Sequence, residues 1–173
     1  MTEDDSTNKI GKLFVWLAWI MAIVLLMFFF EDELDKQYNP NSQPQVSLNS
    51  SGQAEVILKQ NRQGHYVTKG TINETSVTFL LDTGATQVSI PAHIADKLQL
   101  ESYGNYPVQT ANGRVTVYKT KIDQLSIGNI FLYNVAAHIN PAMKNDEILL
   151  GMSALKQLDF QQTGKQLILR EPL

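Results

Sequence analysis

The chain has 173 residues, no cysteine and a formal net charge of −3 at pH 7. The lack of cysteine excludes disulfides and thiol catalysis. The residues from 54 onward carry nearly equal numbers of basic and acidic side chains without a basic cluster, which excludes nucleic acid as an expected partner. His65, His93 and His138 lack metal-ligand spacing, and no glycine-rich phosphate loop occurs, so we expect no metal and no cofactor.

Residues 13–30 are 18 consecutive residues without a charge. As a helix they extend about 27 Å, close to the roughly 30 Å of a bilayer's hydrocarbon core. Trp16 and Trp19 near one end and Phe28 to Phe30 at the other suit the two membrane interfaces. We predict a transmembrane helix after an N-terminal segment of residues 1–12. A cleaved signal peptide is the alternative, but no small-x-small cleavage site follows the run.

The flanks of this helix predict its orientation. Lys9 and Lys12 precede it, whereas acidic residues dominate positions 31–35. Basic residues favour the cytoplasmic side, so residues 1–12 are predicted to be cytoplasmic and the C-terminal part to lie across the membrane. Residues 37–53 hold no charge and are rich in Asn, Gln, Ser and Pro, which predicts a flexible tether over 31–53.

Residues 54–173 are long enough for one hydrophobic core, and their pattern is mostly β. Short apolar or alternating runs separated by Gly, Asn or polar turns predict strands at 55–58, 65–72, 77–81, 115–119, 122–127, 130–139, 147–150 and 166–169. Two helical stretches are expected, at 91–100 and 153–158. The fold class is therefore all-β with one or two short helices.

The apolar strand at 77–81 ends in Asp82-Thr83-Gly84-Ala85. The glycine lets the backbone turn and brings its N–H close to the carboxylate, and the threonine hydroxyl can donate or accept a hydrogen bond. Such a carboxylate is held rigidly at the end of a buried strand, where its pKa becomes tunable. Turns after strands are often built from these residue types, so the tripeptide alone is a weak signal.

Two later elements strengthen that signal. Leu149-Leu150-Gly151 is a second apolar strand that ends in glycine and precedes a short helix. Between the two motifs, Asn112-Gly113 is a strong hairpin signal within residues 109–115. Each element alone is more often structural than functional, and their value lies in their order along the chain.

In this order of parts the chain resembles the single-lobed retropepsins among the aspartic proteases. The resemblance implies a closed retropepsin-like β-barrel with Asp82 as the catalytic residue and a loop supported by Thr83, Gly84 and Ala85. It also implies a substrate flap and a strand passing beneath the site. The flap residues are Ala111, Asn112, Gly113 and Arg114, and the strand residues are Leu149, Leu150 and Gly151.

Peptide hydrolysis by this route needs two carboxylates that share a proton, as is established for aspartic proteases. The chain has a single Asp-Thr-Gly, so the second carboxylate must come from another copy, which predicts a two-fold symmetric homodimer. The resemblance further implies that Thr83 hydrogen-bonds across the dyad. Ala85 cannot donate a hydrogen bond to the carboxylate as a serine would, which predicts a mildly acidic optimum.

Two functional hypotheses follow. The first is an aspartic endopeptidase anchored through residues 13–30 in a bacterial inner membrane, with its domain in the periplasm and peptides or proteins as substrates. The second is a retropepsin-fold module with little turnover that binds extended segments as added strands. An intact Asp82-Thr83-Gly84 favours the first, because a binding module does not need a paired carboxylate.

Overall fold

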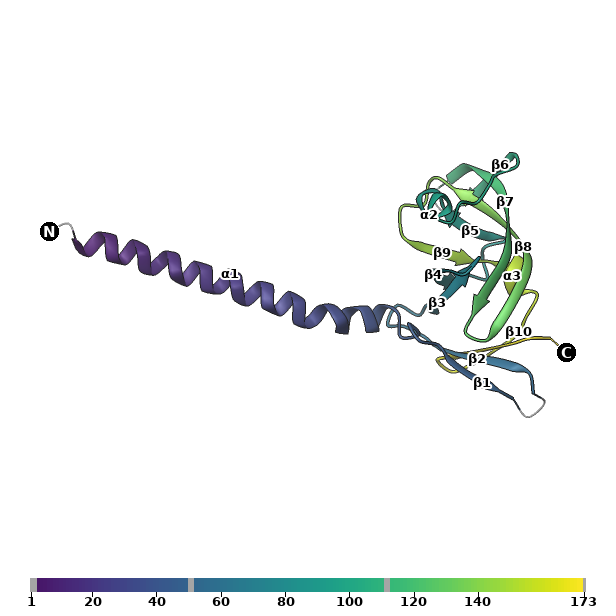
Figure 1. Cartoon of the computed structure of the whole chain (residues 1–173), viewed down its shortest axis with the longest axis horizontal. Coiled ribbons are helices and arrows are strands. Elements are labelled where there is room, and N and C mark those ends of the chain that lie inside the picture. Colours follow the sequence, from purple (N-terminus) through teal and green to yellow (C-terminus); the bar gives the residue numbers. More distant parts are fainter. Residues whose placement is uncertain (1–2, 50–51, 111–112, 173) are drawn as a thin grey trace. The chain divides into compact units, whose positions relative to one another are not determined.

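The computed structural model describes residues 3–49, 52–110 and 113–172. The chain forms two units, Met1–Gln37 and Tyr38–Leu173, each with its own internal contacts. The first unit consists of most of the long helix α1 (Glu3–Tyr38), and the second contains every strand (Figure 1).

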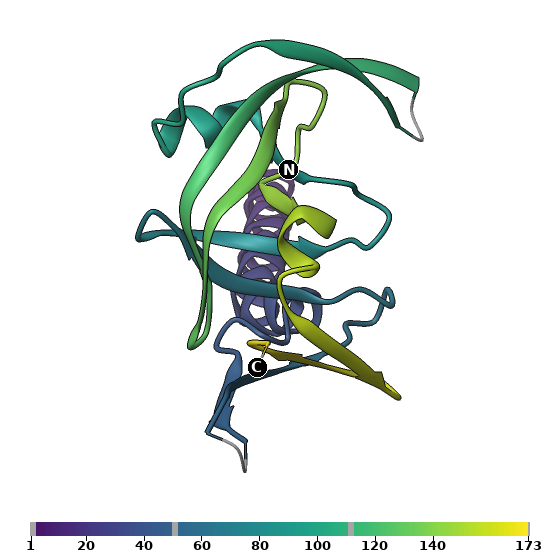
Figure 2. The same cartoon turned by 90° about the vertical axis from the view of Figure 1, so that its right-hand side faces the viewer.

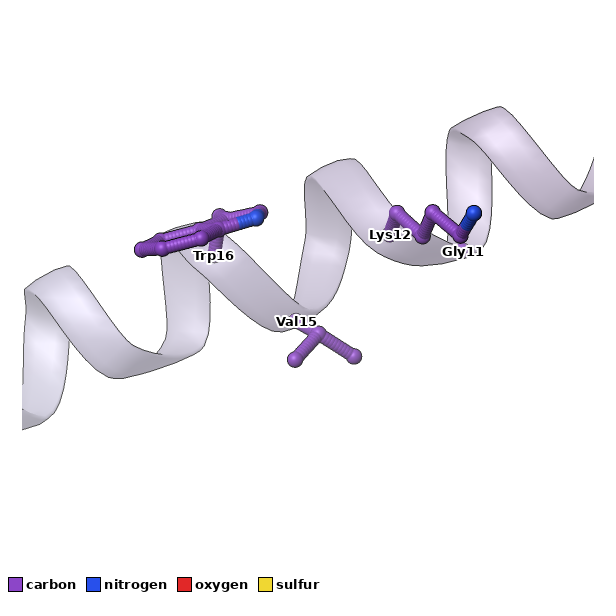
Figure 3. A pocket seen from close by; sticks show the side chains of 4 residues that line it. All are labelled: Gly11, Lys12, Val15 and Trp16. Carbon is purple, nitrogen blue, oxygen red and sulfur yellow. The ribbon is translucent and has the colours of Figure 1, made fainter.

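The apolar helix matches the predicted segment in place but is longer. Between Gly11 and Tyr38 it is long and apolar enough to cross a membrane, although a signal sequence has the same character. Side chains from Leu13 to Phe30 are exposed to the surroundings. Figure 3 shows Lys12, Val15 and Trp16 standing out from the helix, where the shallow hollow that they line with Gly11 is bounded by this helix alone.

The larger sheet closes into a barrel. Its strands run in the order β3 (Val67–Ile72), β4 (Thr75–Leu81), β9 (Glu147–Leu150), β5 (Val88–Pro91), β8 (Ile130–Asn140), β7 (Gly113–Ile127) and β6 (Asn105–Thr110). An additional antiparallel pairing of β3 with β7 joins the two sides of the sheet. The predicted closed, mostly β fold is thereby confirmed.

Gly70 makes this closure possible. A Cβ atom at this position would lie 2.2 Å from the carbonyl oxygen of Ser126 and 2.7 Å from the ring of Phe79. The close approach of β3 to β7 therefore needs a residue without a side chain. The hydroxyls of Thr71 and Ser126, 2.6 Å apart, fasten the same junction.

A second, four-stranded antiparallel sheet has the order β1 (Gln45–Leu48), β2 (Ala54–Lys59), β11 (Gln166–Arg170) and β10 (Asp159–Thr163). Figure 2 shows it at the end of the domain away from the β6–β7 ribbon. The two sheets share one core, which contains the fully buried side chains Leu58, Phe79, Ile90, Ile122, Ile148 and Leu169.

The predicted tether over 31–53 is wrong in extent, since α1 continues to Tyr38 and β1 pairs with β2. Asn41 anchors the intervening segment. Its side-chain amide donates to the carbonyl oxygens of Lys59 and Val67, and its side-chain oxygen accepts from the Lys59 N–H. A polar composition therefore signalled hydrogen bonding to the domain and not flexibility, and the folded unit begins at Tyr38 instead of Ala54.

The other element boundaries differ more modestly. Helix α2 is Ala92–Lys97 and α3 is Met152–Leu155, both shorter than predicted. The two strands expected at 115–119 and 122–127 are one strand, β7. Three further strands were not predicted: β5, β6 and β10. Pro91 in β5 and Pro107 in β6 argued against strands there, because proline has no N–H to donate to a sheet. Strand β10 has one apolar residue, Phe160, among polar ones.

Candidate active site

Asp82 follows β4 directly, at the end of a buried parallel pairing. Phe79, Leu80 and Leu81 pair with Ile148, Leu149 and Leu150 of β9. The ladder continues one step beyond the strand, where the Asp82 N–H donates to the Leu150 carbonyl oxygen at 3.2 Å. The carboxylate therefore projects, partly exposed, from the end of a rigid strand pair.

The loop that follows is closed by its own backbone. The Gly84 N–H donates to Oδ1 of Asp82 at 2.8 Å, and the Ala85 N–H donates to the Asp82 carbonyl oxygen at 3.2 Å. A Cβ atom at Gly84 would lie 3.1 Å from the same carboxylate oxygen. The structure thus confirms the prediction that Gly84 brings its N–H to the carboxylate.

Gly151 lies pressed against the loop. A Cβ atom there would lie 2.6 Å from the Ala85 carbonyl oxygen and 2.4 Å from that of Gln87. The next two amides use this proximity, because Met152 N–H donates to the Ala85 carbonyl oxygen and Ser153 N–H to that of Thr86. The predicted strand beneath the site, Leu149-Leu150-Gly151, therefore lies beside the loop, and the start of α3 fixes the loop's position.

Ser153 fastens the same point from inside the barrel. Its hydroxyl accepts from the Val88 N–H at 3.0 Å and donates to the Ala136 carbonyl oxygen at 2.7 Å. The side chain is buried, so these two hydrogen bonds are shielded from water. It joins the start of β5 to β8 directly after the loop ends.

Thr83 and Gly84 are exposed, whereas Ala85 is partly buried. Thr83 lines one side of a cavity of about 210 Å³ between the loop and the β10–β11 hairpin. Tyr66 lines it too, and within the described parts of the chain its buried hydroxyl has no hydrogen-bond partner. Burial raises the pKa of the Tyr66 phenol, so this side chain lines the cavity as a neutral group.

The predicted flap lies on the β6–β7 hairpin, whose paired arms form a curved ribbon beyond the barrel (Figure 2). Thr110 pairs with Gly113, so the two arms are paired up to the predicted turn. Gly113 begins β7 with φ at +109°, and Arg114 pairs with Gln109. Ala111 and Asn112 lie outside the described residues.

Comparison with known proteins identifies the family. The family described as gag-polyprotein putative aspartyl protease matches residues 68–157, just over half of the chain and a range that contains the whole Asp82 loop. The chain belongs to this family of retropepsin-like aspartic proteases. A crystal structure of a retropepsin-like aspartic protease from Rickettsia conorii matches with a TM-score of 0.59 and 26% identity, covering 75% of this chain and 96% of that one.

Two further relatives carry no assigned function. An uncharacterized protein of Sinorhizobium, from the 5′ region of cobV, is 30% identical over 171 residues, which cover 91% of this chain and 73% of the relative. An uncharacterized protein of Rickettsia prowazekii (strain Madrid E) is 26% identical over 166 residues, which cover 91% and 69%. The similarity therefore extends well beyond the retropepsin-like domain on the N-terminal side.

Several residues around the site were not singled out from the sequence. Gln87 ends the loop, Tyr106 of β6 contacts it, and His138 of β8 contacts Tyr106. Burial lowers the pKa of His138. These residues lie far apart in the chain and come together only in the folded domain, so no sequence spacing connects them. Ser153 was predicted as part of a helix, and its bonds to β5 and β8 carried no sequence signal.

The site offers little to a metal ion. Across the described ranges, no group of three or more His, Asp or Glu side chains is arranged to hold one. His93 lies 2.9 Å from Asp146 at the surface, and His65 is exposed. A partly exposed carboxylate on a rigid, backbone-braced loop can instead accept a proton from water or hydrogen-bond to a substrate.

Proposed function

We propose that this protein is a membrane-anchored aspartic endopeptidase whose water is activated by two Asp82 carboxylates paired across a homodimer. The observation that carries the proposal is the Asp82 loop, where a single partly exposed carboxylate is held by the Gly84 amide on a rigid strand end. Family membership supports it, because the matched range includes this loop.

The chemistry follows from the charge on the pair. One carboxylate is ionised and takes a proton from the attacking water, while the other is protonated and donates to the carbonyl oxygen of the peptide. The water oxygen bonds to the carbonyl carbon and gives a tetrahedral diol. Its C–N bond then breaks as a proton moves to the nitrogen, which releases an amine and a carboxylic acid.

Asp82→Asn tests this chemistry. The change keeps the shape and the Gly84 contact but removes the group that accepts the proton, so we expect cleavage of a peptide library to fall by at least about a hundredfold. Asp96→Asn, on the exposed face of α2, is the matched control and should keep full activity. Equal cleavage by the two variants would reject the assignment of Asp82.

The homodimer is inferred from the count of carboxylates, since the chain contains one Asp-Thr-Gly. Thr83 is exposed at the loop, so a partner copy can reach it there. A mixing experiment with the full-length protein in detergent tests it. Excess Asp82→Asn chain should suppress the activity of a fixed amount of wild-type chain, because mixed dimers lack one carboxylate. Activity independent of the added variant would reject the shared site.

Membrane anchoring through residues 13–30, with residues 1–12 cytoplasmic and the unit from Tyr38 in the periplasm, completes the proposal. Its support is the exposed apolar surface of α1 and the basic residues Lys9 and Lys12 just before the apolar run. The chain has no cysteine, so a single Ser76→Cys variant, at an exposed position of β4, reports sidedness when intact cells are treated with a membrane-impermeant maleimide. Labelling only after cell lysis would contradict this orientation and place the domain in the cytoplasm.

The second candidate function is a binding module for extended segments. Strand β10 favours it, because it lies at the edge of the four-stranded sheet and all five of its residues are exposed. An exposed edge can pair with an added strand. Tight binding of library peptides with no cleavage at any pH between about 4 and 8, the range in which carboxyl and imidazole groups titrate, would favour this alternative.

A further inference from the structure

Tyr106 connects the β6–β7 hairpin to the Asp82 loop. In β6 the side chains alternate between exposed and half-buried, and Tyr106 is on the half-buried face opposite the buried Val117. Its hydroxyl lies 3.2 Å from Oε1 of Gln87 and 3.1 Å from Nδ1 of His138. One side chain of the hairpin thus reaches both the end of the loop and strand β8.

Gln87 is a fixed point for that contact. Its carbonyl oxygen is the atom that a Cβ at Gly151 would meet at 2.4 Å, and the next amide, that of Val88, donates to the buried Ser153 hydroxyl. The backbone of Gln87 therefore has little freedom to shift. A hydrogen bond from the hairpin to the Gln87 side chain therefore fixes the hairpin relative to the loop that carries Asp82.

The tyrosine ring is held on two further sides. The His138 ring meets it edge-on, with centroids 6.1 Å apart and an interplanar angle of 82°. Lys119 of β7, which pairs with His138 in register, places its ammonium 5.6 Å from the ring centroid. An aromatic edge contact and a cation over the ring face both favour one ring orientation, so the hydroxyl is aimed at Gln87 and His138.

The hairpin needs such a tie. Strand β6 is at the edge of its sheet and pairs with β7, and Pro107 in its middle has no N–H to donate. A two-stranded ribbon without further support has little stability in water. The hydrogen bonds of Tyr106 give the β6 arm a side-chain attachment to the body of the barrel.

We infer that Tyr106 is a positioning residue, whose hydroxyl holds the hairpin arm against Gln87 so that the hairpin is presented to a peptide bound at Asp82. This inference rests on the proposed function. It assigns Tyr106 a role in binding the extended substrate and no role in proton transfer, because its contacts are with the loop end and not with the carboxylate.

The test compares Tyr106→Phe with Tyr118→Phe in the full-length protein in detergent. Tyr106→Phe keeps the ring and deletes only the hydroxyl. Tyr118 is on β7 of the same hairpin, is 40% exposed and has no hydroxyl hydrogen bond within the described residues. For Tyr106→Phe we expect amide hydrogen exchange in 105–110 and 113–118 to become about fivefold faster. KM for a cleaved peptide should rise about fivefold, with kcat within about twofold of wild type.

A coupled variant separates this role from general destabilisation. Gln87→Leu removes the partner oxygen, and if the tie acts through it, the double variant Tyr106→Phe/Gln87→Leu should raise KM little more than either single change. Additive effects would assign the two residues independent roles and overturn the inference.

The exchange and cleavage measurements separate a failure of the Tyr106 inference from a failure of the proposed function. If Tyr106→Phe and Tyr118→Phe show the same hairpin exchange and the same KM, the inference is overturned. If wild-type protein cleaves nothing, the proposed function fails, and affinity for a peptide with a hydroxyethylene group in place of the scissile bond replaces KM. Faster hairpin exchange and weaker binding of that probe by Tyr106→Phe would then support the tie, and unchanged binding would overturn it.

Discussion

The Asp82 loop and the β6–β7 hairpin are braced in opposite ways. Backbone groups hold the loop, from the Gly84 and Ala85 amides within it to the Met152 and Ser153 amides that reach it from α3. The hairpin arm extends beyond the barrel and is attached by the side chain of Tyr106. The carboxylate is thus held by short backbone contacts, whereas the hairpin arm depends on the side-chain hydrogen bonds of one residue.

Among the changes considered, Gly151→Ala in the rigid Asp82 loop region should have the largest effect on stability. The added Cβ would lie 2.4 Å from the Gln87 carbonyl oxygen, so the loop must move, and we expect the free energy of unfolding to fall by about 3 kcal/mol. The control is Gly104→Ala, where φ is +97° but nothing lies within 4 Å, at a cost of roughly 1–2 kcal/mol of backbone strain. Urea denaturation measures both, and equal losses would mean that Gly151 does not brace the loop.

Ser153→Ala tests the same half at its second fastening. The Val88 N–H and the Ala136 carbonyl oxygen lose their buried partner, so we expect a loss of about 2 kcal/mol in the free energy of unfolding. Ser76→Ala removes an exposed hydroxyl from β4 and should change stability by less than about 0.5 kcal/mol. A Ser153→Ala protein as stable as the Ser76→Ala protein would contradict this role.

The attachment of the hairpin should depend on pH through His138. Burial lowers its pKa below 6.5, so the folded state holds the neutral ring beside Tyr106. The associated stability is complete above pH 6.5 and is lost as pH falls, because the unfolded chain takes up the proton first. Through this one group, the free energy of unfolding changes by at most about 1.4 kcal/mol per pH unit.

His138→Gln should flatten that slope in denaturation curves recorded between about pH 4 and 7.5, which bracket the imidazole range. His65→Gln, at an exposed position, should keep the wild-type slope. If both variants keep it, His138 does not supply the proton uptake, and the hairpin attachment is insensitive to acid.

Ala85→Ser should have the smallest effect and should alter the loop without touching the hairpin. A serine hydroxyl there can donate to the Asp82 carboxylate and favour its charged form, so the acidic limb of the activity profile should move to lower pH. The shift should be about one pH unit or less, because one hydrogen bond contributes about 0.5–1.5 kcal/mol. Ala85→Val, which adds volume without a donor, is the control. An unchanged acidic limb in Ala85→Ser would place the new hydroxyl away from the carboxylate.

The contrast between loop and hairpin also explains which parts of the site the sequence could predict. Asp82 and Gly84 were predicted from a local pattern, because a glycine two residues after the carboxylate brings its N–H to that group. Gly151 was predicted from the order of the motifs and the resemblance to the retropepsins. The arms of the hairpin pair on either side of the predicted turn, from Thr110 with Gly113 outward. Gln87, Tyr106 and His138 were missed because they come from the end of the loop and from two strands, β6 and β8, and lie together only in the folded barrel.

The sequence by itself determined the apolar helix, the all-β class and the strand that ends at Asp82, because these follow from local hydrophobic patterns and from one short motif. Only the tertiary structure decided that residues 39–48 belong to the domain, through the Asn41 hydrogen bonds and the pairing of β1 with β2. It also decided how Gly151 braces the loop and how Tyr106 attaches the hairpin. Hydrogen bonds between residues far apart in the chain leave no periodic trace in the sequence, since their partners are chosen by the closure of the barrel.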